Sequence, residues 1–198
     1  HETYKSVFMK HSNELPEIVV DQEGKQQVID FRFKESHKPR YCKRPKDRPG
    51  SAKYKLLEAF AKDFLGKGLI KRNLRTPWAN RALFVAKYAL DAARGGVPDS
   101  LRFCLDLSNA NDEIDMIPAE HGNVEHELSR VAGHKYYIQA DSASAYWSFD
   151  LSERSKDAAS VWLPHNGEWC LFSFQRLPMG SRNAATHMNA FYHRIAEL

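Results

Sequence analysis

Hydrophobic residues recur at helical spacing in the stretch that follows Ser51. The apolar positions are three or four residues apart, and charged residues fill the positions between them. Ser51 suits the N-cap, and Gly66 and Gly68 are typical of a helix end. The pattern predicts an amphipathic helix that packs on one side only. Its apolar face would hold Leu56, Leu57, Phe60, Ala61, Phe64 and Leu65.

Two pairs of apolar runs rich in aromatic and β-branched residues predict β-hairpins. Residues 82–87 and 101–107 flank a polar loop with two glycines and a proline, which indicates a long hairpin. Residues 158–163 and 168–174 flank Asn166-Gly167, a dipeptide typical of tight hairpin turns. The chain therefore combines antiparallel hairpins with helices, which predicts a mixed fold of the α/β (α+β) class.

Weaker patterns complete the expected elements. Residues 17–20 and 27–31 are short strand candidates, and residues 180–198 predict a helix that packs Met188, Phe191, Tyr192 and Ile195 toward the core. Asn123 can cap another helix, whose buried face would hold Val124, Leu128, Val131 and Ala132.

Asp141 follows an aromatic run, Tyr136-Tyr137-Ile138, that favours a strand. The small residues after it leave room for a ligand beside the chain turn. Asp141 would then lie at a strand end and bind a metal or a phosphate-bearing ligand. The alternative is a surface carboxylate that caps the next helix.

A basic segment broken by prolines occupies residues 34–50. Proline excludes a regular helix here, so we expect an extended arm on the surface. Two interpretations remain open for its charges, a solvated linker and an arm that contacts phosphates. The cations are Lys38, Arg40, Lys43, Arg44, Lys46 and Arg48.

Composition narrows the class of protein. The 198 residues are 27% charged and 42% hydrophobic with a net charge of +4, which is ordinary for a globular protein. No apolar run approaches the roughly 20 residues of a membrane span. Cys42, Cys104 and Cys170 lack metal-ligand spacing, which favours free thiols in a reducing, intracellular compartment. The first residue is His, so we expect a segment of a longer polypeptide.

Four blocks occur in an order that is typical of one polymerase family. They are Thr76-Pro77-Trp78-Ala79 through Val85-Ala86-Lys87, Arg102-Phe103-Cys104-Leu105-Asp106 with Asn111, Lys135 to Tyr146, and Leu177-Pro178-Met179-Gly180-Ser181-Arg182-Asn183-Ala184. From about residue 31 to 198 the chain resembles the reverse transcriptase of gypsy-type LTR retrotransposons and, more distantly, of retroviruses.

The resemblance implies a fold of right-hand polymerase fingers with part of the palm. Residues 1–33 would be N-terminal strands of uncertain role and 34–50 the basic arm. Residues 51–134 would be fingers-like, and 135–198 would be a partial palm that contains the first catalytic aspartate and ends before an Asp-Asp hairpin. Partners would be an RNA or DNA template-primer, deoxynucleotide triphosphates and the rest of a polyprotein, in a cytoplasmic particle or the nucleus, with no membrane.

The resemblance also implies roles for individual residues. Asp141 would be the catalytic carboxylate that binds Mg²⁺ (or Mn²⁺), together with the backbone carbonyl of Ser142. Lys87 and Arg102 would bind the triphosphate, although either could be a solvated strand charge. Tyr146 would exclude the ribose 2′-hydroxyl, or pack as a core tyrosine. Met179 and Gly180 would face the nucleotide, and Lys38, Arg40, Lys43, Arg44 and Arg182 would contact nucleic acid.

Departures from the family pattern keep a second hypothesis open. Ser108 stands where many relatives have Arg, Met179 where gypsy-type enzymes have Phe, Ala145 where they have Gly, Ser181 where they have Leu and Ala185 where they have Pro. The family's Asp-Asp motif does not occur in the 198 residues. We therefore expect a polymerase fragment incomplete for catalysis alone. The alternatives are a catalytically silent nucleic-acid-binding or protein-interaction module derived from a reverse transcriptase, and an unrelated α/β fold.

Overall fold

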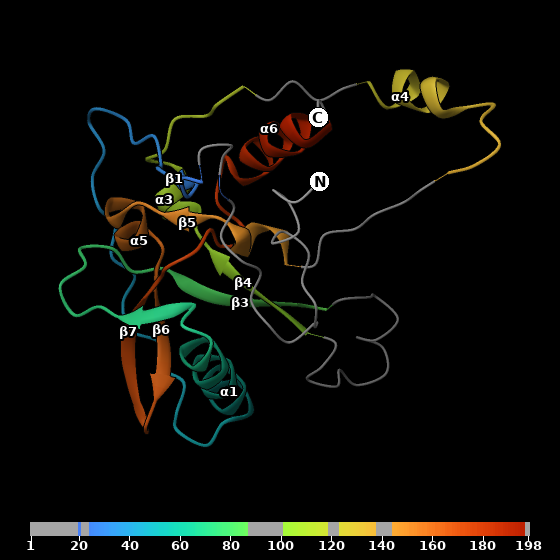
Figure 1. The fold of residues 1–198 in the computed structure, drawn as a ribbon. Helices are drawn as coiled ribbons and strands as arrows, with labels where there is room; N and C mark the ends of the chain where they lie inside the picture. The colour runs from blue at the N-terminus through green and yellow to red at the C-terminus, as the bar shows by residue number, and fades with distance from the viewer. Residues whose placement is uncertain (1–19, 21–23, 87–100, 119–122, 138–143, 197–198) are drawn as a thin grey trace.

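The fold was examined in a computed structural model that describes residues 20, 24–86, 101–118, 123–137 and 144–196 (Figure 1). Within these ranges the chain forms short antiparallel sheets and a set of helices. This arrangement confirms the predicted mixed fold with antiparallel hairpins packed with helices. None of the helices in these ranges combines the length and hydrophobicity that a membrane span requires.

The predicted amphipathic helix is present as α1 (Ala52–Gly66). The Ser51 hydroxyl accepts a hydrogen bond from the backbone N–H of Tyr54, so Ser51 is the N-cap. Tyr54, Leu57, Ala61 and Phe64 are buried along one face, and the face packs against β6. The helical spacing of the apolar residues therefore reflects the burial of one face of the helix, as the sequence pattern predicts.

A three-stranded antiparallel sheet forms beside α1, in the order β2 (Ile70–Arg72), β7 (Glu168–Phe174), β6 (Ser160–His165). Asn166 and Gly167 both have positive φ, at 52° and 81°, as a tight hairpin turn requires. The second predicted hairpin is thus confirmed.

The first predicted hairpin consists of β3 (Arg81–Ala86) and β4 (Leu101–Asp106), paired antiparallel from Arg81 opposite Asp106 to Ala86 opposite Leu101. Asn80, which is fully buried, connects the start of this hairpin to the other sheet. Its side-chain Nδ2 donates to the carbonyls of Ala158 and Ser160 at 2.7 and 2.9 Å. The two hairpins are therefore held to each other by a buried amide.

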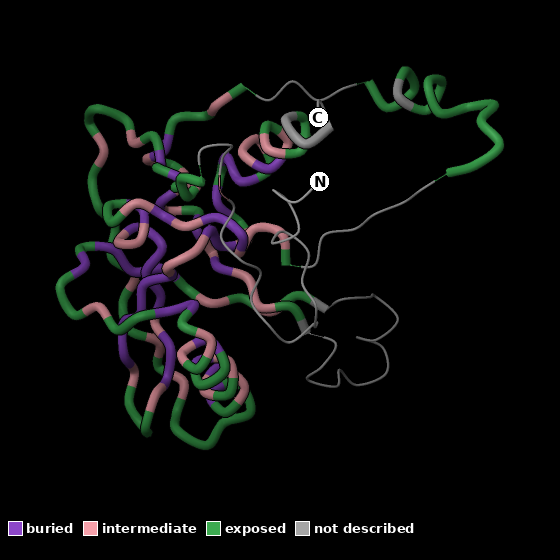
Figure 2. Tube along the Cα trace, viewed as in Figure 1, coloured by how far each residue is buried: buried purple, intermediate pink, exposed green. Residues whose placement is uncertain are grey.

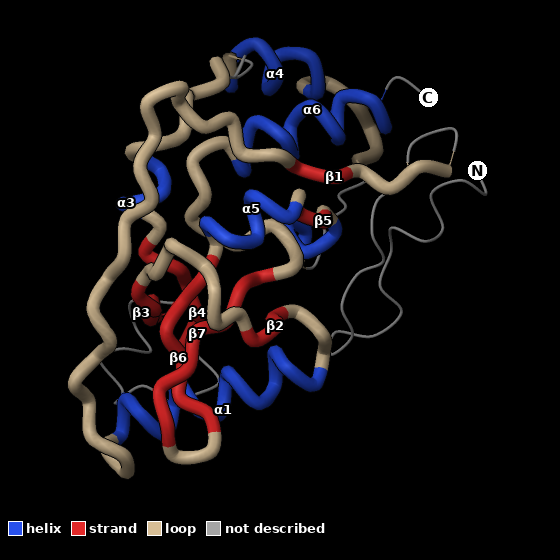
Figure 3. Tube along the Cα trace, turned by 90° about the vertical axis from the view of Figure 1, so that its left-hand side faces the viewer, coloured by secondary structure: helices blue, strands red, loops and turns tan. Residues whose placement is uncertain are grey.

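The remaining elements are a third small sheet and several short helices. They are β1 (Val28–Ile29), which pairs in parallel with β5 (Asp150–Leu151), and the helices α3 (Ser108–Asn111), α4 (Val124–Val131), α5 (Glu153–Ala158) and α6 (Ala184–Ala196), with the 3₁₀ helix η3 (Ala145–Ser148). Figure 3 shows residues 34–50 as a loop that runs along one side of the molecule to the start of α1.

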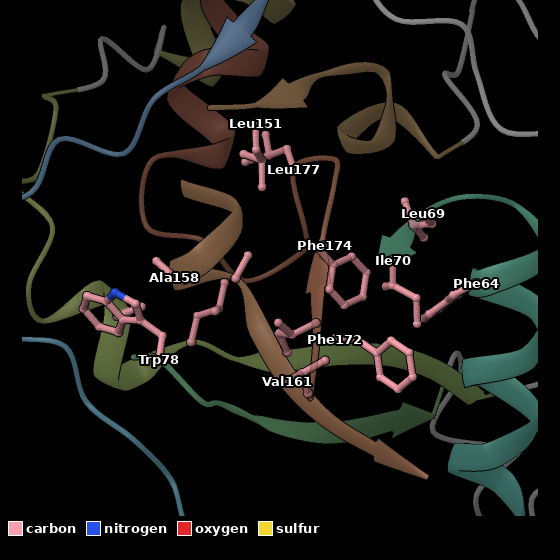
Figure 4. Close-up of a cluster of buried hydrophobic side chains, with 14 of the residues drawn as sticks. Phe64, Leu69, Ile70, Trp78, Leu151, Ala158, Val161, Phe172, Phe174 and Leu177 are labelled. Carbon is pink, nitrogen blue, oxygen red and sulfur yellow. The ribbon is translucent and has the colours of Figure 1, made fainter. Parts of the chain in front are cut away.

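Aromatic rings from four elements meet in the core around Phe64 of α1. Its ring lies 5.1 Å from Phe103, 5.7 Å from Trp147 and 5.8 Å from Phe174, measured between ring centroids. Figure 4 shows part of the same cluster, in which Ile70 lies opposite Phe174 and Val161 lies opposite Phe172. Because α1, β4, η3 and β7 share this cluster, the core joins both hairpins to the helix.

Two sequence predictions are wrong. The helix capped by Asn123 exists as α4, but its supposed buried face is exposed, with Val124 71%, Leu128 60% and Val131 49% accessible (Figure 2). Amphipathic spacing predicts the helix and its apolar face, but it does not supply a surface for that face to pack on.

The second wrong prediction is the strand through Tyr136 and Tyr137. Both residues lie in irregular backbone and are 80% and 64% exposed. Aromatic composition favours a strand only where a neighbouring strand pairs with it. No strand within the described ranges pairs with these two residues.

Candidate nucleotide-binding surface

Arg102 lies on β4, opposite Val85 of β3, with an exposed side chain. Because side chains alternate along a strand, Arg102 shares a face with Cys104, while Phe103 and Leu105 point into the core. Burial raises the pKa of the Cys104 thiol, and the positive charge of Arg102 opposes that rise.

The turn that contains Met179 packs on the same face of the hairpin. The Cys104 Sγ lies 3.9 Å from the Met179 Sδ, although 75 residues separate them in sequence. The structure thus brings together two of the predicted nucleotide-side residues, Arg102 and Met179, on either side of Cys104.

Gly180 follows Met179 and lies against the backbone of β4. Its φ is +103°, and a Cβ at this position would come within 2.8 Å of the Leu105 carbonyl oxygen. A side chain there would meet both unfavourable backbone geometry and a clash. Glycine is needed here for close approach between two backbones.

Asn111, the last residue of α3, binds this turn from the other side. Its Nδ2 donates to the Gly180 carbonyl at 2.9 Å, and its Oδ1 accepts from the backbone N–H of Arg182 at 2.9 Å. The family motif includes Asn111, but sequence reasoning assigned it no role. The motif spacing could have drawn attention to it, although not to its partners.

Arg182 is engaged within the chain. Its Nη1 donates to the carbonyls of Asn111 and Ile114, at 2.7 and 3.2 Å. These bonds join the start of α6 to the end of α3. A contact between Arg182 and nucleic acid stays a prediction.

Ser108 stands where many relatives have Arg, and it forms a local contact instead. Its hydroxyl donates to Asp106 Oδ1 at 2.6 Å, and its backbone N–H donates to the same oxygen at 3.3 Å. Asp106 thereby links the end of β4 to the start of α3. This departure from the family pattern keeps the strand-to-helix connection compact.

Tyr146 lies in η3, half-buried against the hydrophobic core. In the part of the chain that the structure describes, it makes no hydrogen bond or ring contact with Arg102 or Met179. The structure therefore does not bring Tyr146 together with the β4 face, and its two interpretations stay open.

The basic arm divides into a paired part and an unpaired part. Arg40 forms ion pairs with Asp112 at 3.2 Å and with Glu113 at 2.9 Å, and the Lys38 backbone N–H donates to Glu113. The Lys38 bond and then Arg40 hold the pKa of Glu113 below its ordinary value. Arg40 is thus engaged in binding the arm to the loop after α3.

Two tryptophans hold the following part of the arm against the second hairpin. The indole N–H of Trp162 donates to the Cys42 carbonyl at 2.9 Å, and that of Trp169 donates to the Asp47 carbonyl at 3.3 Å. Lys43 and Arg44 lie between these points. Both are exposed and have no ion pair within the described ranges. No sequence pattern predicted these two tryptophan hydrogen bonds, which are called the tryptophan clamp below.

The remaining predicted residues, Lys87, Asp141 and Ser142, lie outside the described residues. Inside them, no group of three or more His, Cys, Asp or Glu side chains could hold a metal ion. The expected metal site therefore rests on Asp141 and Ser142 and stays a prediction.

Comparison with known proteins bears on the fold. No protein-family model matches the chain, and no curated protein sequence matches it. Among solved structures, it is similar to the crystal structure of the prototype foamy virus protease-reverse transcriptase (CSH mutant), with a TM-score of 0.66 and 18% sequence identity. The match covers 98% of this chain and 23% of the viral one. The chain therefore has a reverse-transcriptase-like fold.

Proposed function

We propose that the chain is the fingers and partial palm of a retroelement RNA-directed DNA polymerase of the gypsy type, and that it binds template-primer and deoxynucleotide triphosphate. The observation that carries the proposal is that Arg102 and Cys104 share one face of the β3–β4 hairpin and that the Cys104 Sγ lies 3.9 Å from the Met179 Sδ. These residues come from two of the four ordered motifs. The similarity in fold to a reverse transcriptase supports the same conclusion.

The chemistry of this face suits a nucleotide. Arg102 offers a planar set of N–H donors for phosphate oxygens, and its exposure leaves them free to reach a ligand. Met179 offers an apolar, polarisable surface beside it. Gly180 brings the turn close to the β4 backbone, so a nucleotide on this face would meet both β4 and the turn.

Nucleic acid would follow the unpaired part of the arm. Lys43 and Arg44 are exposed cations on a backbone that Trp162 and Trp169 hold in place. A fixed backbone lowers the entropy cost of presenting charges to phosphates. Binding through these residues should weaken steeply with salt.

Asp141 would be a ligand of Mg²⁺ or Mn²⁺, with the carbonyl of Ser142 beside it. Such an ion, when bound, stabilises the charge that develops on the reacting oxygens. The Asp-Asp motif of the family is absent from the 198 residues. We therefore propose that the 198 residues bind substrates but do not complete the catalytic carboxylate set.

Formation of a ternary complex tests the proposal without requiring catalysis. The chain is titrated with a fluorescent RNA–DNA primer-template, with and without the deoxynucleotide that pairs with the next template base. A polymerase fragment should bind the primer-template more tightly with the matching nucleotide than with a mismatched one. Arg102→Ala should abolish this difference, whereas Arg75→Ala, an exposed arginine remote from the face in sequence, should preserve it. Equal binding with both nucleotides would favour the silent nucleic-acid-binding module.

A further inference from the structure

The carboxamide of Asn111 binds both ends of the turn that carries Gly180. Its Nδ2 donates to the Gly180 carbonyl, and its Oδ1 accepts from the Arg182 backbone N–H, each at 2.9 Å. Arg182 donates back to the Asn111 carbonyl at 2.7 Å. One side chain thus pairs with the turn as a neighbouring backbone strand would, with a donor and an acceptor side by side.

Asn111 is also fixed relative to Arg102. It lies in α3, which begins at Ser108, two residues after β4 ends at Asp106. The hydrogen bonds from Ser108 to Asp106 keep that connection short. A single stretch of chain therefore supplies both the guanidinium of the candidate surface and the amide that holds the opposing turn.

The turn has little freedom once Asn111 holds it. Gly180 lies so close to the Leu105 backbone that an added Cβ would come within 2.8 Å of the carbonyl oxygen, which leaves no room for a side chain between the turn and β4. The two Asn111 bonds tie the turn to α3, which directly follows β4. These bonds therefore help to set the position of Met179 relative to β4.

We propose that Asn111 is a positioning residue, whose carboxamide fixes the Met179–Gly180 turn at the spacing from β4 that a nucleotide requires. This inference rests on the function proposed above and adds a determinant of the same surface. Asn111 acts through the turn and needs no contact with the nucleotide. An aspartate of nearly the same shape would place an acceptor against the Gly180 carbonyl, and the turn would separate from α3.

The chain contains a matched control for this substitution. Asn183 also uses both ends of its carboxamide. Its Nδ2 donates to the Asp115 carbonyl at 2.9 Å, and its Oδ1 accepts from the Ile117 N–H at 3.1 Å. It lies just before α6, and among the described residues it makes no hydrogen bond to Met179 or Gly180. Asn111→Asp and Asn183→Asp each remove one donor bond and keep the acceptor, and only the Asn111 bond reaches the turn.

The test compares both variants of the full 198-residue chain with wild type. Binding of a fluorescent deoxynucleotide triphosphate is titrated in the presence of Mg²⁺ and primer-template, and the melting temperature and amide hydrogen exchange are measured alongside. Asn183→Asp should lose at least as much thermal stability as Asn111→Asp, because Asn183 is buried and Asn111 is only half-buried. Asn111→Asp should weaken nucleotide binding about tenfold or more, which corresponds to about one lost hydrogen bond, whereas Asn183→Asp should change it less than about twofold. Aspartate keeps the acceptor oxygen, so exchange at the Arg182 amide in the first variant and at the Ile117 amide in the second should accelerate only as far as the lost donor bond loosens each contact.

Three results would overturn the inference in distinguishable ways. If wild type and Asn111→Asp bind the nucleotide equally, Asn111 has no positioning role and the proposed function stands. If both variants weaken binding to the same extent, the effect is general destabilisation. If wild type binds no nucleotide with primer-template present, the proposed function fails, and the positioning role fails with it.

Discussion

The backbone of Gly180 lies directly on the carbonyl of Leu105, so that a single added methyl group would come within 2.8 Å of that oxygen. Seventy-five residues of sequence separate the turn from β4. Their contact joins the last of the four family motifs to the second one. The candidate nucleotide surface is built on this junction.

Gly180→Ala should therefore destabilise the fold and disturb the candidate surface together. The cost combines strain at a positive φ with the clash against a backbone atom, and we expect about 1–3 kcal/mol in the free energy of unfolding. Denaturant unfolding measures this cost, and nucleotide titration measures the loss of binding.

Gly66→Ala is the matched control for that substitution. Gly66 ends α1, and an added Cβ would have nothing within 4 Å. We expect it to be neutral or stabilising by up to about 1 kcal/mol. If the two alanine variants unfold alike, the close approach of Gly180 to Leu105 is not the reason for its glycine.

Two arginines of the basic arm should respond differently to alanine. Arg44 is exposed without an ion pair in the described part of the chain, so Arg44→Ala should weaken binding of single-stranded nucleic acid and reduce the salt slope by about 0.7. Arg40 pairs with Asp112 and Glu113, so Arg40→Ala should leave the slope nearly unchanged. Binding isotherms at several salt concentrations measure both. Equal slopes for the two variants would contradict the division of the arm into a part paired with carboxylates and a part free to bind phosphates.

The stability that Glu113 contributes should depend on pH. Its folded-state pKa lies below the ordinary value of about 4.3, because the Lys38 N–H and the Arg40 guanidinium favour the carboxylate. The contribution is therefore fully present above the ordinary value and is lost as the pH falls through the lowered one. Glu113→Gln should be less stable than wild type at pH 7, and the difference should shrink below about pH 4. Thermal melts from pH 3 to pH 7 measure this, with the exposed Glu35→Gln as a charge control. A pH-independent difference would rule out the ionic origin.

Phe64 should be among the costliest core positions to truncate. Its ring contacts Phe103, Trp147 and Phe174, which come from three other elements. Phe64→Ala should lower the free energy of unfolding by about 3–5 kcal/mol, or prevent folding. Leu74→Ala, at a side chain that is 75% exposed, should change it by less than about 0.5 kcal/mol. Comparable losses in both variants would contradict the assignment of this aromatic cluster as the core.

Local sequence patterns predicted the helices and turns that are stabilised by residues close to them in the sequence. Helical spacing together with Ser51 is sufficient to define α1, and Asn166-Gly167 is sufficient to place the turn between β6 and β7, because caps and tight turns depend on neighbouring residues. The burial of α4 and the strand at Tyr136 were wrong because both depend on a partner surface. Neither a helical period nor aromatic composition specifies a partner.

In the candidate site, too, the sequence predicted individual residues but not their tertiary contacts. The motifs singled out Arg102, Met179 and Gly180, and the structure places the Met179–Gly180 turn against Cys104 and Leu105, on the strand that also carries Arg102. Their contacts could not be predicted, because they depend on how β4 and the turn before α6 meet in space. The two-ended bond of Asn111 and the tryptophan clamp on the basic arm are tertiary features of the same kind.

We propose that the chain is part of an RNA-templated polymerase whose first catalytic carboxylate is Asp141. The most direct measurement is extension of a DNA primer on an RNA template by a polypeptide that joins this chain to an Asp-Asp hairpin segment taken from a reverse transcriptase of the gypsy type. We predict Mg²⁺-dependent synthesis, no detectable synthesis by the 198 residues alone, and a loss of about a hundredfold or more in Asp141→Asn, since a metal ligand contributes several kcal/mol to such a step. Synthesis that is equal in wild type and Asp141→Asn would contradict the claim.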